Sequence, residues 1–135
     1  MSPRDVARLI AAGRIAIGAA LLLAPRLATL PWIGVADASR PGAKVLARAM
    51  GARDVVIGAI ALHTLGNPQV APRWQKAGAA VDGVDLAATL AARRELPRGG
   101  VALVVTMATF GVSGQLWAAA GLGRTGQTSP PQPAI

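Results

Sequence analysis

The sequence predicts an all-α integral membrane protein that folds as a four-helix bundle with short loops. Of the 135 residues, 53% are hydrophobic and only 15% are charged, whereas an average soluble domain has about 25% charged residues. Aromatic residues make up 3% and there are 16 glycines, a composition that suits helices packed closely in lipid. Four apolar segments, at about 6–24, 43–65, 74–92 and 99–121, would form one domain over residues 1–123.

The last apolar segment is the clearest candidate for a membrane span. No charged residue lies between Arg98 and Arg124. A helix over this stretch would be about 37 Å long, which exceeds the ~30 Å thickness of a hydrocarbon core. Trp117 lies near its end, where an interfacial aromatic anchor is expected.

The first segment ends at Pro25, and the following stretch Pro31–Gly34 is expected to be an interfacial loop. The uncharged stretch Ile15–Pro25 would be only about 16 Å long as a helix, so a full crossing takes Arg14 into the membrane. The alternative is a cleaved signal peptide with basic residues at its start. No good small-x-small cleavage site follows, and three more apolar segments remain, so the membrane span is preferred.

Helix-breaking or charged residues end the second and third segments. The segment 43–65 stops at Gly66-Asn67-Pro68, and 74–92 stops at Arg93-Arg94-Glu95. Short connections favour an up-down bundle, with four spans and both termini on one side. The tail 124–135 is rich in Pro, Gln, Ser and Thr and is predicted to be disordered.

A weak internal repeat occurs at a spacing of 40 residues. Seven of sixteen positions are identical between the two copies, although chance accounts for part of this in an alanine-rich chain. The identical positions of the first copy are Ala7, Arg8, Ala12, Ile17, Gly18, Ala19 and Leu22. Small residues at every fourth position, 12–24 and 79–91, predict close-packing helix faces, and Gly111, Ser113 and Gly114 are candidates for the same role.

Charged residues inside the first three segments are the main functional signal. Each costs about 2.5–3.5 kcal/mol near the centre of a membrane helix, a cost that is tolerated where such groups face the bundle interior and pair. Three arginines and three aspartates sum to zero charge and predict an interior network: Arg14, Arg48, Arg53, Asp54, Asp82 and Asp85.

Helical spacing suggests the partners. Asp82 and Asp85 share one helix face, whereas Arg53 and Asp54 lie about 100° apart on a helix and need different partners. We therefore expect Asp82 and Asp85 to face Arg14 and Arg53, with Asp54 in the network or at its edge. The network either sets helix register or lines a polar path for a proton, an ion or a small anion. If the third segment lies on the membrane surface instead, its two aspartates face water.

Other candidate sites are weaker. His63, the single histidine, is expected to be an interfacial polar residue, with a proton relay as the alternative. Residues 121–126 match G-x-G-x-x-G, but they follow a membrane helix rather than a strand, so dinucleotide binding is not predicted. No nucleophile triad, phosphate-binding loop or metal-binding motif is present in the sequence. We therefore predict no catalytic residue, no cofactor, no metal site and no enzymatic activity.

The net charge of +8 raises the question of partners. The basic residues are scattered and have no interleaved aromatic residues that could stack on bases, so nucleic acid is not predicted. Arginines near helix ends instead favour contact with anionic lipid head groups. The absence of cysteine excludes disulfides and thiolate chemistry.

Two stretches resemble a known family. They are Arg14–Arg26 and Gly51–Gly58, which contains the step Gly-Ala-Arg-Asp. Both resemble small, uncharacterised multi-pass membrane proteins of high-GC bacteria, grouped as a domain of unknown function, and the similarity extends to about Leu122. The resemblance implies a helical membrane fold and assigns no activity to any residue.

Together these features favour a non-enzymatic multi-pass protein of the bacterial cytoplasmic membrane. It would act as an accessory or structural component of a membrane assembly, associated with the lipid bilayer and with itself or another membrane protein. The alternative is a small transporter or channel for protons, ions or small anions that uses the Arg/Asp network.

Overall fold

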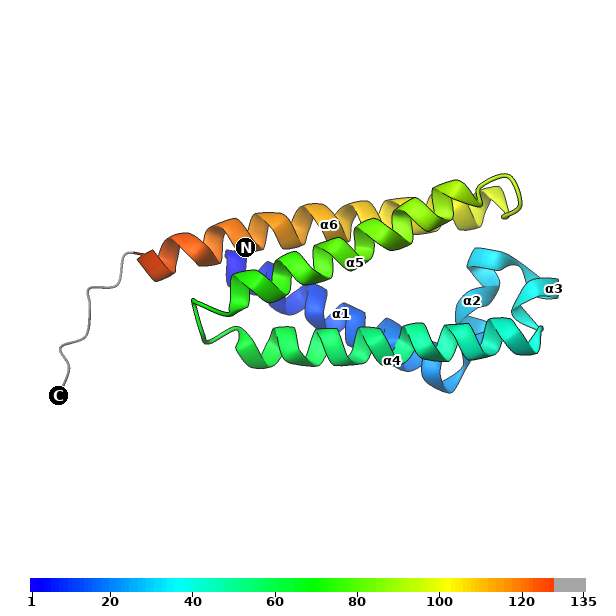
Figure 1. Ribbon diagram of the computed structural model, residues 1–135, viewed down its shortest axis with the longest axis horizontal. Helices are drawn as coiled ribbons and strands as arrows, with labels where there is room; N and C mark the ends of the chain where they lie inside the picture. The colour runs from blue at the N-terminus through cyan, green and yellow to red at the C-terminus, as the bar shows by residue number, and fades with distance from the viewer. Residues whose placement is uncertain (128–135) are drawn as a thin grey trace.

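The computed structural model describes the backbone of residues 1–127 and the side chains as far as Arg124. Within this range the chain is all-helical and has no strand, so the all-α prediction is confirmed. Six helices follow one another: α1 (Pro3–Leu23), α2 (Pro25–Ile33), α3 (Val35–Ala38), α4 (Pro41–Thr64), α5 (Ala71–Ala91) and α6 (Arg98–Gln127) (Figure 1).

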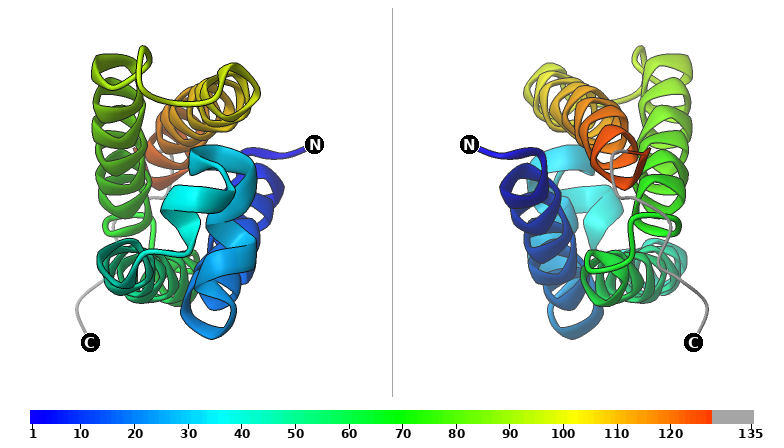
Figure 2. Two further views of the ribbon diagram at one scale, coloured as in Figure 1. Left: turned by 90° about the vertical axis from the view of Figure 1, so that its right-hand side faces the viewer. Right: turned by 90° about the vertical axis from the view of Figure 1, so that its left-hand side faces the viewer.

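The four long helices form two packed pairs. Helix α1 packs on α4, and α5 packs on α6. Seen along the bundle, the α5–α6 pair lies above the α1–α4 pair (Figure 2). The N-terminus lies beside the C-terminal end of α6, while α2 and α3 lie at the opposite end of the bundle (Figure 1). We call these the terminus end and the α2 end.

The helix boundaries follow from caps and breakers. At the start of α1, the Ser2 hydroxyl accepts a hydrogen bond from the Asp5 backbone N–H, and the Asp5 carboxylate accepts one from the Ser2 backbone N–H. This capping box satisfies two N–H groups that would otherwise lack partners. Helix α4 begins at Pro41, whose fixed φ suits the first helical position.

The predicted interfacial loop at Pro31–Gly34 is mostly helical, so this expectation was wrong. Helix α2 starts at Pro25 and continues through Pro31 to Ile33. Proline ended α1 as expected, but it also started the next helix, because a missing N–H costs nothing in a first turn. The break occurs at Gly34, whose φ of 84° lies in the left-handed region.

The disordered tail was predicted to begin at residue 124, and this boundary is too early. Helix α6 continues through Arg124 to Gln127, so this part of the prediction was wrong. Extending an existing helix adds one hydrogen bond per residue, and no proline occurs before Pro130 to stop it. Residues 128–135, the rest of the predicted tail, lie outside the described residues.

Helices α1 and α4 approach each other through glycine. A Cβ added to Gly18 would lie 2.7 Å from the Gly51 carbonyl oxygen, and a Cβ added to Gly58 would lie 2.8 Å from the Ala11 carbonyl oxygen. These contacts follow the 40-residue repeat, because Ala11 aligns with Gly51 and Gly18 aligns with Gly58. The two helices therefore meet through approximately two-fold-related contacts, as in an isologous interface.

The predicted small-residue faces are largely wrong. On α1 the buried residues include Ala11, Arg14 and Gly18, whereas Ala12, Ala16 and Ala20 of the predicted 12–24 face are exposed. On α5 only the first residue of the 79–91 series is buried, and the later residues are half-buried or exposed. The burial of Arg14 determines the rotation of α1, which turns the alanine series away from the core. On α6, Gly111 packs on Asp82 and Gly114 on Ile10, as expected, whereas Ser113 is exposed.

Large and small apolar side chains are distributed in an unusual way. Among the described side chains, ten of the thirteen buried hydrophobic residues are alanine. Large residues face outward instead, with Phe110 76% exposed, Leu46 66% and Leu9 64%. Soluble proteins bury large apolar residues preferentially, so an apolar environment suits this surface better than water.

Two helices are long and apolar enough to cross a membrane by length and composition, α1 and the part of α6 from Arg98 to Arg124. Helices α4 and α5 each carry four charged residues along their length. Hydropathy alone therefore supports two spans, and crossing by α4 and α5 depends on how their charges are partnered.

Candidate functional site: a charged cluster beside a cavity

Five charged side chains from three helices converge between the two helix pairs. Arg14 comes from α1, Arg53 and Asp54 from α4, and Asp82 and Asp85 from α5. We call these five residues the charged cluster. The structure thus brings together five of the six residues that the sequence proposed for an interior network.

Arg14 is the centre of the cluster. Its side chain is buried, with the residue 8% exposed. Nη1 donates to Asp54 Oδ1 at 2.9 Å, and Nη2 donates to Asp82 Oδ1 and to the Gly78 carbonyl oxygen. One guanidinium therefore joins α1, α4 and α5, and the expected Arg14–Asp82 pair is present.

Arg53 makes the second part of the cluster. Its Nη1 and Nη2 donate to the two carboxylate oxygens of Asp85 at 3.1 and 2.7 Å, a bidentate pair. Its Nε also donates to Asp54 Oδ1 at 3.3 Å. As expected, the two neighbours have different main partners, Asp85 for Arg53 and Arg14 for Asp54. The additional contact between them forms because the long arginine side chain can bend back towards the next residue.

Sequence reasoning missed Gln115 of α6. Its Nε2 donates to Asp82 Oδ2 at 2.6 Å and to the Gly111 carbonyl oxygen at 2.9 Å. Space for these groups comes from glycine, because a Cβ on Gly78 would overlap the Gln115 amide and a Cβ on Gly111 would overlap the Asp82 carboxylate. A signal was present in the sequence, since Gln115 is the single side-chain amide in the uncharged stretch 99–123.

Arg48 does not belong to the cluster. It is exposed on α4 and makes no ion pair with any described residue. Five residues separate it from Arg53, which is about 140° around a helix, so the two side chains leave α4 on different faces. The predicted charge balance is therefore wrong. Two guanidinium groups face three carboxylates, which gives a formal net charge of −1.

His63, the proposed proton relay, lies apart from the cluster. It is exposed near the end of α4. Nine residues separate it from Asp54, about 14 Å along a helix. No hydrogen bond joins it to the cluster within the described part of the chain.

The three carboxylates differ in how well they are partnered. Both oxygens of Asp85 accept from Arg53, and the oxygens of Asp82 accept from Arg14 and Gln115. Both hydrogen bonds to Asp54 use Oδ1. Asp54 Oδ2 is therefore the one cluster carboxylate oxygen without a partner among the described residues, although Asp54 is only 9% exposed.

A cavity of about 600 Å³ opens beside the cluster. Apolar residues of α1, α2 and α6 form most of its wall, among them Ile10, Ile17, Leu21, Trp32, Leu103 and Phe110. Its charged lining consists of Arg14, Asp54, Asp82 and Asp85. Asp54, the carboxylate with an oxygen that no described residue contacts, is therefore part of the cavity wall.

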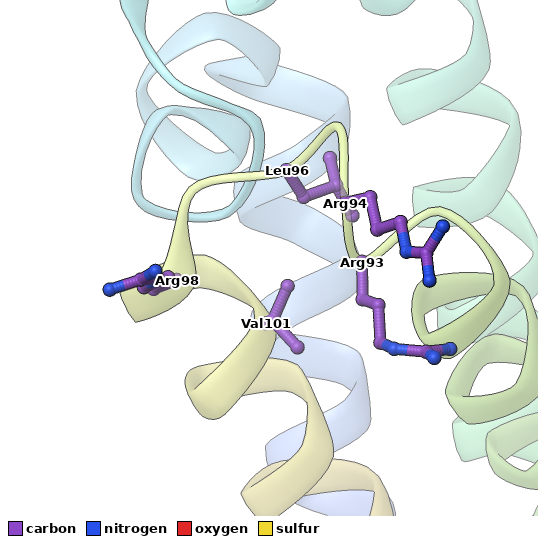
Figure 3. A pocket seen from close by; sticks show the side chains of 5 residues that line it. All are labelled: Arg93, Arg94, Leu96, Arg98 and Val101. Atoms are coloured by element: carbon purple, nitrogen blue, oxygen red, sulfur yellow. The ribbon is translucent and has the colours of Figure 1, made fainter.

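A second hollow of about 520 Å³ lies at the α5–α6 turn and is lined by Arg93, Arg94, Leu96, Arg98 and Val101. The side chains of Arg93 and Arg98 point in different directions (Figure 3). Arg93 donates to the Leu90 carbonyl oxygen of its own helix. Because the guanidinium groups do not converge, this turn does not form a focused anion site.

The described residues contain no group of three or more His, Cys, Asp or Glu side chains arranged to hold a metal ion. The chemistry available to the site is therefore that of carboxylates, guanidinium groups and one amide. Comparisons of this chain with protein-family models, with curated proteins and with solved structures found no match.

Proposed function

We propose that the chain is a multi-pass protein of the bacterial cytoplasmic membrane in which α1, α4, α5 and α6 cross the bilayer. The outward-facing large apolar side chains and the alanine-rich interior support this proposal. Four of the eight charges on α4 and α5, those of Arg53, Asp54, Asp82 and Asp85, have partners inside the bundle, which is compatible with crossing. The other four lie within the first eight residues of their helices: Lys44, Arg48, Arg73 and Lys76. The even number of spans would leave both termini on one side.

A carbonate wash of isolated membranes tests this arrangement. A multi-pass protein stays in the membrane fraction, because apolar burial holds it rather than surface charge. Release by the wash contradicts membrane insertion. Reporter tags at the two termini should both respond from one side, and opposite sides would mean that one long helix does not cross.

We further propose that the charged cluster binds a proton or a small monovalent cation and exchanges it through the cavity, as in a small transporter or channel. The observation that carries this proposal is Asp54 Oδ2, a carboxylate oxygen without a partner among the described residues, on a side chain that is 12% exposed and lies in the cavity wall, in a cluster with one more carboxylate than guanidinium. An unbalanced negative charge is costly in a low-dielectric interior. A bound proton or monovalent cation removes that cost, and the same charge disfavours a small anion.

A structural role in a membrane assembly is the second candidate function. The bidentate Arg53–Asp85 pair and the three-helix contacts of Arg14 support it, because they hold helices together without any ligand. The two functions differ in what they require of Asp54. A structural cluster needs only an acceptor at Oδ1, whereas a binding site needs the negative charge.

Proton or cation flux in proteoliposomes, compared between the wild type and Asp54→Asn, separates the two functions. The amide oxygen of Asn can still accept from Arg14 and Arg53, and the substitution makes the cluster neutral, so we expect a folded protein with an unchanged melting temperature. Flux should fall to that of protein-free liposomes. Asp37→Asn is the matched control, because Asp37 is exposed and pairs with Arg40 at the surface.

Absence of flux in the wild type would contradict transport and would leave the structural role as the remaining candidate function. Undiminished flux in Asp54→Asn would show that ions cross by another route. A melting temperature lowered by Asp54→Asn as much as by Asp82→Asn would mean that the negative charge of Asp54 serves the fold.

A further inference from the structure

We propose that the cavity beside the charged cluster binds a lipophilic organic monocation, such as a quaternary ammonium or phosphonium ion that carries apolar groups. This inference rests on the proposed function and names a substrate class for the same site. In it, the apolar groups of the ligand contact the wall formed by α1, α2 and α6, and its cationic centre lies near Asp54.

The size and the walls of the cavity fit such a ligand. Pockets for small organic molecules are typically about 300–1,000 Å³ and mostly apolar, with a few polar groups that orient the ligand. This cavity has about 600 Å³, and its polar groups are concentrated on the side where α4 and α5 contribute Asp54, Asp82 and Asp85. A hydrated inorganic ion would leave the apolar wall unused, whereas an amphiphilic cation uses both sides.

The charge of the cavity lining favours a cationic ligand over an anionic one. One guanidinium and three carboxylates belong to the lining, while Arg53 is bonded to Asp85 and does not line the cavity. Two of the carboxylates have both oxygens occupied, so the third, Asp54, offers the free acceptor. An organic anion of the same size would meet a net negative lining.

The apolar wall contains side chains that suit organic cations. Trp32 of α2 and Phe110 of α6 are aromatic residues of the lining, and aromatic faces attract cations. Met50 and Met107 also line the cavity, and methionine adapts its shape to ligands of different outline. These features favour a class of hydrophobic cations over one closely fitted compound.

The charged groups around Asp54 leave one acceptor for the ligand. Arg14 of α1 and Arg53 of α4 contact Asp54 and are also paired with Asp82 and Asp85 of α5. A cationic centre near Asp54 Oδ2 therefore supplies the counter-charge that the cluster lacks.

Titration calorimetry of the full chain in mild detergent tests the proposal with two probes of equal shape and opposite charge. Tetraphenylphosphonium should bind saturably. Tetraphenylborate should show no saturable binding. Equal binding of both probes would mean partition into an apolar groove and would overturn the proposal.

Substitutions test separately whether binding needs the charge of Asp54 and the open volume of the cavity. Asp54→Asn should abolish tetraphenylphosphonium binding, and the exposed Asp37→Asn should leave it unchanged. Ala20→Phe, which places a ring in the cavity lining, should also abolish binding, whereas Ala16→Phe lies one turn away on α1 and outside the lining. Unchanged binding in Asp54→Asn or in Ala20→Phe would overturn the proposal. If Asp54→Asn fails to fold, the Ala20→Phe result and the contrast between the two probes decide.

The outcomes also distinguish this inference from the proposed function. Asp54-dependent proton flux without tetraphenylphosphonium binding would leave the proposed function standing and remove the substrate class. Asp54-dependent tetraphenylphosphonium binding without flux would establish a binding site and remove transport.

Discussion

The two ends of the bundle differ in how α1 meets α6. At the terminus end Gly114 packs on Ile10 and Gly121 on Pro3. Beside these contacts lies a closed apolar core of small and medium residues: Ala7, Leu65, Ala71, Ala118 and Leu122. Towards the α2 end, residues of the same two helices line the cavity instead, for example Ile17 and Met107.

One row of positions on α6 accounts for much of this difference. Every seventh residue lies near the same face of a helix, and the row consists of Gly100, Met107, Gly114 and Gly121. The three glycines contact Trp32, Ile10 and Pro3 so closely that a Cβ would overlap them. Met107 lines the cavity. Helices thus touch where the row offers glycine, and the cavity occurs where it offers a long side chain.

The charged cluster lies at the boundary between the closed and the open end, and Arg14→Gln should disrupt it most. The substitution leaves Asp54 and Asp82 without their main cation, and breaking such a buried pair costs about 3–5 kcal/mol. A large fall in melting temperature in detergent is expected. Adding Asp82→Asn should recover part of the loss, because the double variant removes a stranded charge.

Arg48→Gln is the control for this prediction. Arg48 is exposed and outside the cluster, and surface changes usually stay within about 0.5 kcal/mol. If Arg14→Gln were as neutral as Arg48→Gln, the Arg14 side chain would face water. Because Arg14 pairs with Asp82 of α5, α5 would then lie at the membrane surface and would not cross the bilayer.

Two glycine substitutions compare a tightly packed contact with the cavity wall. Gly51→Ala places a Cβ 2.5 Å from the Gly18 carbonyl oxygen, a backbone atom that cannot move alone, and overpacking of this kind costs about 1–3 kcal/mol. Gly13 of α1 lines the cavity, and a Cβ added there would have no atom within 4 Å. Gly13→Ala should therefore stabilise the helix by about 0.5–1 kcal/mol.

Thermal unfolding of both glycine variants in one detergent measures this difference. Opposite signs are expected for the two changes in melting temperature. Equal destabilisation would mean that the cavity is filled in solution and that the open end packs like the closed one.

A gain similar to that of Gly13→Ala is expected from Thr89→Val on α5. Thr89 is 1% exposed and its hydroxyl has no hydrogen-bond partner among the described residues. Replacing an unsatisfied hydroxyl by a methyl group of similar shape should raise stability by about 1 kcal/mol. Thr109→Val, at an exposed position of α6, is the matched control and should change little. A lowered melting temperature in Thr89→Val would show that the hydroxyl is hydrogen-bonded in solution.

Several features of this protein were determined by local sequence. Proline and glycine, together with the Ser2–Asp5 capping box, end and start helices through backbone geometry, which acts over a few residues. Charged residues in apolar segments identified five members of the cluster, because burying a charge requires a partner. The spacing of Asp82 and Asp85 also predicted that both face the same side of their helix, since a helix places residues three apart on one face.

Only the tertiary structure decided the rest, because it depends on the rotation and separation of whole helices. Rotation of α4 excludes Arg48 and so leaves the cluster with one carboxylate in excess. The approach of α6 brings Gln115 to Asp82 and leaves Asp54 Oδ2 as the free acceptor. The cavity arises from side-chain sizes on helices far apart in sequence, and no local pattern encodes the distance between them.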